Sequence, residues 1–401
     1  MRVSRLTLTS FRSFSKVQLE PGPGINILFG ANAQGKTTVL EAISILATTR
    51  SLRASRESQV IRHGEESAEI TAEIEREREG EAELNVAYFE GDRKAVRFNT
   101  VKRPRVLDLL GEFNAVYFGP QDLAIVQGEP SERRRYLNVE ISQISPRYVY
   151  DLAQYKRSLA QRNRLLRDFR ERGKTVQESG LEAWNEQLIS YGSRIVEKRR
   201  FFLDRLSPIA DEIHLELTEG RERLETRYAP SISLPENGAC ESPAPERNHG
   251  KAAEQVVTGS GPQDRIAAQF RKRLLQVSAD EIRRGATLLG PQRDDLFFYI
   301  SGRDAGIFGS QGQQRTVALA LKLAEFRLIE EYVGEPPVML LDDVMSDLDD
   351  SRRAHLLRWL KPETQAFLTC TSLRAFPAEV LKRAAVFKVE DGSIRPQSTD
   401  G

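Results

Sequence analysis

A glycine-rich segment at residues 30–38 carries the clearest chemistry in this sequence. It reads G-x-x-x-x-G-K-T-T and follows a short apolar run at residues 25–29. Glycines let the backbone curl so that its N–H groups face a phosphate, and a helix that starts after Gly35 directs the positive end of its dipole at the same anion. The predicted ATP-binding residues are Gly30, Ala31, Asn32, Ala33, Gln34, Gly35, Lys36, Thr37 and Thr38.

Two side chains of this loop have specific predicted tasks. We expect Lys36 to reach the β- and γ-phosphates as a catalytic residue and the Thr37 hydroxyl to bind Mg²⁺. The alternative is a plain glycine-containing turn between a strand and a helix. It is disfavoured because strand, loop and helix all fall where the phosphate-binding motif requires them.

Two adjacent carboxylates follow another apolar run, at residues 338–341. Four apolar residues and then an acid describe a buried strand that carries Asp342 out at its carboxyl end. In phosphate-loop enzymes such an acid binds Mg²⁺, so we predict that Asp342 is a metal ligand. Asp343 points differently and is predicted to polarise the attacking water as a catalytic residue. A solvated turn or a helix cap is the alternative for the Asp pair taken alone.

Residues 308–315 read Phe-Gly-Ser-Gln-Gly-Gln-Gln-Arg and precede a predicted helix. A Ser and a Gly ahead of a helix N-terminus make an anion site. The segment resembles the signature of ATP-binding-cassette ATPases, although a Gln replaces the first Gly of the usual pair. An ordinary N-cap is the alternative. The predicted signature residues are Ser310, Gln311, Gly312 and Gln313.

Composition limits the class of protein. A chain of 401 residues favours two domains, and 39% hydrophobic with 29% charged residues is typical of a globular protein. The formal net charge of +1 neither favours nor excludes nucleic acid, so the distribution of charge has to be considered. The two cysteines form neither a metal motif nor a disulfide framework, which fits the cytoplasm. No apolar run is long enough to span a membrane.

Hydrophobic periodicity predicts an α/β fold with a P-loop. Residues 2–29 and 68–98 alternate as strands with one wet face, whereas the strands near the phosphate loop are buried on both faces. We therefore expect one mixed sheet, antiparallel at one side and parallel around the loop. Residues 131–206 have a helical pattern that predicts two long antiparallel helices.

The predicted organisation is a head interrupted by a helical arm or lid. The head comprises residues 1–128 and 287–401, and the arm comprises residues 129–286. Within the arm, residues 229–261 are rich in Pro, Gly, Ser and Asn and predict a mobile loop.

The order of these motifs along the chain indicates which class of ATPase the sequence resembles. A phosphate loop near the N-terminus, with signature and acidic strand near the C-terminus, resembles the ABC-ATPase heads of SMC proteins, but the insertion here is only about 160 residues and lacks sustained heptads. The sequence is most similar to the RecF family of bacterial recombination mediators, over nearly its whole length. The similarity is carried by residues 8–14, 30–38, 120–123, 128–137, 161–163, 290–295, 310–313 and 341–349.

The resemblance implies a cytoplasmic ATPase that dimerises around ATP and Mg²⁺, with Ser310 of one copy completing the phosphate loop of the other. It implies binding to double-stranded DNA and to single/double-strand junctions at gaps. It also implies cooperation with RecO and RecR to load RecA during DNA repair and replication. Gln121 resembles the cassette glutamine that senses Mg²⁺ and the γ-phosphate, which implies a catalytic and metal-binding role. Residues 346–349 resemble the loop that faces the partner subunit.

Three departures from the related patterns bear on these expectations. Gln292 replaces the His of the family's usual Gly-Pro-His-Arg-Asp-Asp. Asp343 stands where many cassette ATPases have a longer Glu, and Cys370-Thr371-Ser372 contains no switch histidine. Slow hydrolysis, suited to a timer or clamp and stimulated by DNA, is therefore implied.

The predicted arm is basic. Residues 131–206 hold 17 Lys and Arg against 10 Asp and Glu, an excess of seven that favours contact with phosphates. A solvated helix face is the alternative for each Arg. An SMC-like structural DNA tether, which uses ATP only for assembly, is the alternative function. The candidate DNA-binding residues are Arg133, Arg134, Arg135, Arg162, Arg164 and Arg167.

Overall fold

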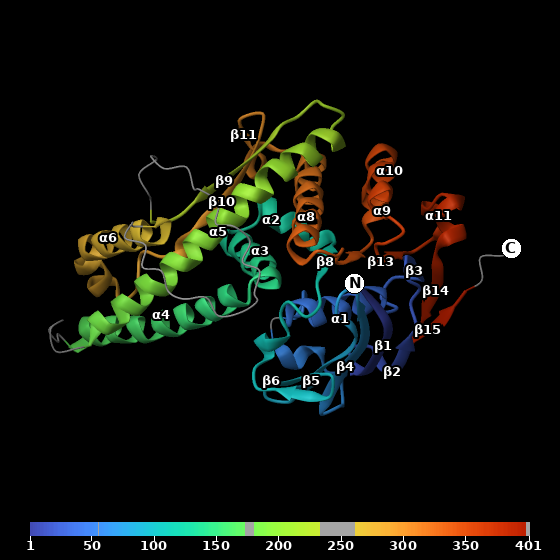
Figure 1. Ribbon diagram of the computed structural model, residues 1–401, viewed down its shortest axis with the longest axis horizontal. Helices are drawn as coiled ribbons and strands as arrows, with labels where there is room; N and C mark the ends of the chain where they lie inside the picture. The colour runs from blue at the N-terminus through green and yellow to red at the C-terminus, as the bar shows by residue number, and fades with distance from the viewer. Residues whose placement is uncertain (55, 173–179, 233–260, 398–401) are drawn as a thin grey trace.

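The computed structural model describes residues 1–54, 56–172, 180–232 and 261–397 (Figure 1). The predicted mobile loop therefore lies mostly outside the described residues. Within the described residues, no helix combines the length and the apolar character needed to cross a membrane.

The first sheet is antiparallel and has six strands in the order β2-β1-β4-β5-β6-β7. Its strands alternate between buried and exposed residues, as expected for a sheet with one wet face. In β4, for example, Ala68, Ile70, Ala72 and Ile74 all point into the core. The strands are β1 (Arg2–Phe11), β2 (Phe14–Leu19), β4 (Ser67–Arg76), β5 (Gly80–Phe89), β6 (Arg93–Phe98) and β7 (Val101–Arg103).

The second sheet has the order β15-β14-β3-β13-β12-β8 and is parallel except for β15. Its central strands are buried on both faces, so they are nearly continuous apolar runs. In β3, Ile27 and Leu28 face opposite hydrophobic clusters. The strands are β3 (Ile25–Phe29), β8 (Ala115–Phe118), β12 (Val338–Leu341), β13 (Ala366–Cys370), β14 (Ala385–Glu390) and β15 (Ser393–Pro396).

Helix α1 (Lys36–Thr48) packs between the two sheets. Its apolar side chains join one cluster with residues of both sheets, including Leu8 of β1 and Phe367 of β13. The α/β class is confirmed, and the sheet around the phosphate loop is mixed through β15, but the antiparallel strands expected at its side form a sheet of their own. Because the helix that follows the phosphate loop is buried on both sides, the antiparallel and parallel strands form separate layers.

The arm is built from long helices that project from the head at the left of Figure 1. Where two helices were expected over residues 131–206, the described residues of this range belong to three, since a break at Ser145 separates α3 from α4. Helices α4 and α5 form the expected pair, and α6 packs on both. The helices are α3 (Pro130–Ile144), α4 (Pro146–Arg172), α5 (Leu181–Leu217) and α6 (Pro262–Arg284).

A small three-stranded sheet belongs to the arm. Strand β10 (Asp295–Ile300), expected in the head, pairs antiparallel with β9 (Leu224–Ala229) and with β11 (Arg303–Asp304). Strand pairing therefore crosses the predicted boundary at residue 287, ahead of α8 (Gln311–Val333). Helix α8 packs against α5 and β8, so it links arm and head.

The remaining helices are short connections around these layers. The 3-10 helix η3 and helix α2 follow β8 directly, and α9 follows β12. The remaining α-helices are α2 (Leu123–Gln127), α7 (Ala305–Phe308), α9 (Val344–Asp347), α10 (Asp350–Trp359) and α11 (Ala378–Arg383). The 3-10 helices are η1 (Glu57–Val60), η2 (Val106–Leu109), η3 (Pro120–Asp122), η5 (Pro291–Arg293) and η6 (Leu373–Ala375).

Candidate nucleotide-binding site

The phosphate loop joins the carboxyl end of β3 to the first turn of α1. Two of its glycines are required by close packing as well as by a positive φ. A Cβ on Gly30 (φ +156°) would lie 2.3 Å from the carbonyl oxygen of Val389, and one on Gly35 (φ +106°) would lie 2.8 Å from the ring of Phe14. The β14–β15 turn also contacts the loop, since the Asp391 N–H donates to Oε1 of Gln34 at 2.8 Å.

Lys36 already lies inside this loop. Its ammonium donates to the carbonyl oxygens of Gly30 and Ala31, each at 2.7 Å. Burial lowers the pKa of Lys36, while the nearby carboxylates of Asp343 and Asp342 act in the opposite direction. The ammonium is held by two acceptors that a phosphate could replace.

Asp342 lies where the acidic strand meets the loop, and it receives three hydroxyl hydrogen bonds. Its Oδ1 accepts from Thr37 at 2.9 Å and from Thr369 at 2.7 Å. Its Oδ2 accepts from Tyr117 at 2.8 Å. The side chain is almost fully buried, so these donors replace the water that a carboxylate needs.

This arrangement fits Mg²⁺. A carboxylate and a threonine hydroxyl lie side by side, and both are hard oxygen ligands of the kind that Mg²⁺ prefers. In the described part of the chain, no group of three or more His, Cys, Asp or Glu could hold a metal by itself. The ion would complete its shell with phosphate oxygens and water, as is usual in nucleotide sites.

Asp343 has an unusual backbone. Its φ and ψ are 54° and 23°, in the left-handed region that Asp tolerates better than most residues. The Asp343 N–H donates to Oγ1 of Thr369 at 2.8 Å, and its carbonyl accepts from Ser346 at 2.7 Å. These backbone bonds fix the turn at the half-buried Asp343, directly after Asp342.

Gln121 lies on the η3 turn that follows β8. The turn is closed by the Gly119 N–H, which donates to Oδ2 of Asp122 at 2.8 Å. Gln121 is exposed and lines the same cavity as Tyr117, the residue whose hydroxyl contacts Asp342. Burial raises the pKa of Tyr117, so its hydroxyl remains a donor.

Tyr117 was missed by sequence reasoning, although a signal was available. A tyrosine inside a buried strand must find a partner for its hydroxyl, and β8 runs beside the strand that carries Asp342.

The signature segment lies at the N-terminus of α8. Ser310 is the N-cap: its Oγ accepts from the Gln313 N–H at 3.2 Å, and Oε1 of Gln313 accepts from the Ser310 N–H at 2.9 Å. Gln313 also donates to Glu222 of the arm at 2.8 Å. Ser310, Gln311 and Gly312 are exposed. Ser310 is thus an N-cap, as one of the two interpretations predicted. The same helix end is exposed and therefore accessible to an anion.

Two candidate DNA contacts are buried instead. Arg162 is 1% exposed and its guanidinium binds Glu281, Asn185 and Thr287 at 2.6, 2.7 and 2.8 Å. Arg133 forms a two-pronged ion pair with Asp295, at 2.7 and 3.0 Å. Both guanidiniums are consumed in joining arm elements, so neither side chain is available to a DNA phosphate in this structure. Arg135, Arg164 and Arg167 are exposed, and Arg134 is partly exposed.

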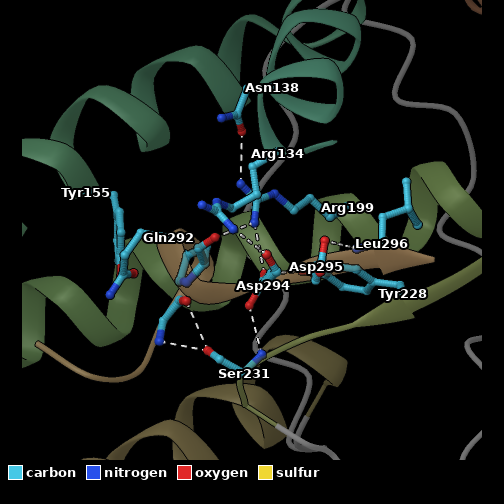
Figure 2. Close-up of polar contacts among 12 residues, drawn as sticks. Arg134, Asn138, Tyr155, Arg199, Tyr228, Ser231, Gln292, Asp294, Asp295 and Leu296 are labelled. Carbon is cyan, nitrogen blue, oxygen red and sulfur yellow. Dashed lines mark hydrogen bonds and ion pairs between the residues drawn. The ribbon is translucent and has the colours of Figure 1, made fainter. Parts of the chain in front are cut away.

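The Gly290–Asp295 motif, residues 290–295, forms a buried junction in the arm (Figure 2). Asp294 accepts from Arg199 at 2.9 Å, from the backbone N–H of Ser231 at 2.8 Å and from the hydroxyl of Tyr228. Arg134 donates to the carbonyl oxygen of Asp294 at 2.9 Å.

Gln292 of the same motif accepts from the Tyr155 hydroxyl and donates to the carbonyl of Leu289. Its neutral amide can therefore meet both demands in the place of the family's His.

Comparison with protein families assigns residues 2–395 to the RecF/RecN/SMC N terminal domain. Fold and site therefore define a nucleotide-binding head of the SMC and RecF class. The chain is 38% identical to the DNA replication and repair protein RecF of Geobacillus kaustophilus over 398 residues, which cover 99% of this chain and 100% of the relative. It is 39% identical to the protein of the same name from Staphylococcus carnosus over 395 residues, which cover 98% and 100%. The chain belongs to the RecF family.

Solved structures agree. The recombination mediator protein RecF of the RecFOR pathway, solved with ATP, superimposes with a TM-score of 0.85 at 32% identity, and the match covers 99% of this chain and 97% of that one. An Smc head domain from Pyrococcus furiosus has a TM-score of 0.52 at 18% identity, covering 98% and 95%, which supports the shared fold only.

Proposed function

We propose that this chain is a cytoplasmic, ATP-dependent DNA-binding mediator of DNA repair and replication that works as an ATP-induced dimer. Its relatives bear the name DNA replication and repair protein RecF, and a similar solved structure is described as a recombination mediator in the RecFOR pathway. Double-stranded and gapped DNA, RecO, RecR and RecA are the proposed partners.

One observation carries the proposal: the phosphate-binding half of the site is preformed, whereas the signature is not part of it. Lys36, Thr37 and Asp342 are already arranged within hydrogen-bonding distance of the phosphate loop or of one another. The hydrogen bonds of Ser310, by contrast, stay within the first turn of α8. A second copy of the chain would supply the missing half.

The surface beside the signature supports a dimer. Ile307 and Phe308 lie just before Ser310, and their exposed fractions are 74% and 70%. Large apolar side chains so exposed are typical of a surface that another protein covers. In this proposal, the surface from Ile307 to Gly312 is covered by the partner copy, whose phosphate loop holds ATP.

The geometry suggests how the chain's own residues act. Lys36 exchanges the carbonyl oxygens of Gly30 and Ala31 for phosphate oxygens of ATP. Thr37 and Asp342 hold Mg²⁺, which neutralises phosphate charge when bound. Asp343 orients the attacking water, and Gln121 sits on the turn beside Tyr117, where it responds to the occupied site. A short Asp in the water-orienting position supports slow hydrolysis.

A basic cavity supports DNA binding. It has a volume of about 540 Å³, lies between the end of α1 and helices α3 and α4, and is lined by Arg50, Arg134, Arg135 and Lys156. Partial burial, with the nearby charges of Arg50 and Arg199, lowers the pKa of Lys156. Cations gathered against their mutual repulsion favour an anionic partner, and we assign this cavity to the DNA backbone.

Phosphate release tests the proposal against a purely structural tether. Gapped duplex DNA should stimulate ATP hydrolysis by the wild-type chain. Lys156→Ala should weaken this response and reduce the salt dependence of DNA binding by about one unit of slope. The matched control is Lys16→Ala, which removes an exposed lysine from β2 of the antiparallel sheet, away from this cavity. ATP binding with no response to DNA would instead indicate a tether.

A further inference from the structure

Tyr117 lies between two parts of the site that the sequence assigns separately. Its hydroxyl donates to Oδ2 of Asp342 at 2.8 Å, and its side chain lines the same cavity as Gln121. Asp342 directly follows the strand β12, whereas Gln121 lies on η3, three residues beyond the end of β8. One buried tyrosine therefore lies between the predicted metal ligand and the predicted sensor.

The Gln121 turn is folded closely over this tyrosine. A Cβ on Gly119 would lie 2.4 Å from the Tyr117 hydroxyl oxygen and 2.8 Å from the ring. Gly119 has extended backbone angles that other residues adopt, so the space, not the backbone, excludes a side chain. The turn and the ring thus determine each other's position.

The two carboxylate oxygens of Asp342 are held by different partners. Thr37 and Thr369 bind Oδ1, and among the described residues only the tyrosine hydroxyl is seen on Oδ2. Three donors on one carboxylate fix its plane and keep Oδ1 beside Thr37. Hydrogen bonds to a ligating carboxylate orient it for its metal, and their loss typically weakens metal affinity by about 10–100-fold.

We propose that Tyr117 is a positioning residue for the Mg²⁺ half of the site, which holds Asp342 in its ligating orientation and ties that orientation to the Gln121 turn. This inference rests on the proposed function, because it takes Asp342 and Thr37 as the Mg²⁺ ligands. Tyr117 contacts neither the nucleotide nor the metal in this scheme and acts only through Asp342 and the Gln121 turn.

A phenylalanine substitution isolates the hydroxyl. Tyr117→Phe keeps the ring under Gly119 and removes only the donor. The matched control is Tyr136→Phe: Tyr136 lines the same cavity of about 300 Å³ as Tyr117 and is equally buried, and its hydroxyl has no hydrogen-bond partner within the described part of the chain. Both variants delete one buried oxygen, so general effects on packing should be similar.

The readout is the affinity for a fluorescent ATP analogue, measured with EDTA and then with increasing Mg²⁺. We expect Tyr117→Phe to match wild type in EDTA, since the phosphate loop is untouched, but to need at least about tenfold more Mg²⁺ for half of the gain in affinity. Tyr136→Phe should behave as wild type. Gly119→Ala, whose methyl group displaces the Tyr117 hydroxyl, should raise the Mg²⁺ requirement in the same direction.

The outcomes separate this role from the proposed function. If wild type gains affinity from Mg²⁺ and Tyr117→Phe gains it over the same Mg²⁺ range, the role of Tyr117 is overturned. An equal loss of affinity with EDTA and with Mg²⁺ would also overturn it, because that indicates a general disturbance of the site. A wild-type chain that binds nucleotide under neither condition would overturn the proposed function and this role with it.

Discussion

The hydroxyl of Thr37 donates a hydrogen bond to Oδ1 of Asp342 over 2.9 Å, although 305 positions separate the two residues in the chain. This contact joins the phosphate loop to the acidic strand. It depends on β13, which pairs with both β3 and β12 and so brings their carboxyl ends together. The arm is inserted between these strands in sequence without separating them in space.

Removing the lysine of the loop should prevent ATP binding. Lys36 is the cation that the loop encloses, and a charge-assisted hydrogen bond contributes about 1.5–3 kcal/mol. Lys36→Ala should therefore lose ATP binding in a fluorescence titration while its thermal unfolding temperature stays close to that of wild type. Unchanged affinity would contradict the assignment of this loop, and Lys16→Ala should bind ATP normally.

Asp343→Asn should bind ATP and hydrolyse it far more slowly. Asn tolerates the left-handed backbone at this position as well as Asp does, so the turn should survive. The amide cannot act as a base, and we expect the ATP-bound dimer to accumulate. Phosphate release and sedimentation velocity measure the two effects, and hydrolysis at the wild-type rate would remove the proposed role of Asp343.

Arg162 and Arg164, which are neighbours on α4, should differ in how much they contribute to the free energy of unfolding. Arg162→Ala leaves the buried carboxylate of Glu281 unpaired, so the free energy of unfolding should fall by about 3–5 kcal/mol. Arg164→Ala alters an exposed side chain and should change stability by less than about 0.5 kcal/mol. Urea denaturation of the two variants provides the comparison. Equal losses would mean that the ion pair of Arg162 contributes little.

Stability should fall on the acid side because of His214. Burial lowers the pKa of His214 from its ordinary value of 6.5, so the unfolded chain takes up a proton there before the folded chain does. The stability is fully present above pH 6.5 and is lost as the pH falls below it. His214→Asn keeps an N–H for the carbonyl of Glu222 and removes the titrating ring.

The urea midpoint of wild type should therefore drop more than that of His214→Asn between about pH 7.5 and pH 5.5. Parallel pH profiles for the two proteins would show that His214 does not titrate in this way.

Much of the site was predictable from sequence because its parts are local. The loop around Lys36 and the acid after an apolar run, Asp342, are encoded within a few residues each. For Tyr117 the sequence signalled only that a buried hydroxyl needs a partner; that the partner is Asp342 depends on the pairing of β8 with β12 and on the close approach of Gly119.

Charge was a poorer guide than motif. The excess of Arg in the arm predicted DNA contacts, but composition cannot distinguish Arg162, which is paired with a carboxylate 119 positions away, from its exposed neighbour Arg164. The number of sheets was missed because the apolar alternation within a strand does not show which strands pair, and only the structure shows residues of two sheets in one cluster with α1.

Mixing two inactive variants tests the central claim, a site shared between two copies. Lys36→Ala lacks the phosphate side, and Ser310→Arg blocks the signature side while leaving ATP binding intact. In a mixed dimer, the intact Lys36 of one chain meets the intact Ser310 of the other, so one complete site forms. Sedimentation velocity with ATP should show monomers for each variant alone and dimers for the mixture. Monomers in the mixture, or a normal ATP dimer of Ser310→Arg alone, would contradict the claim.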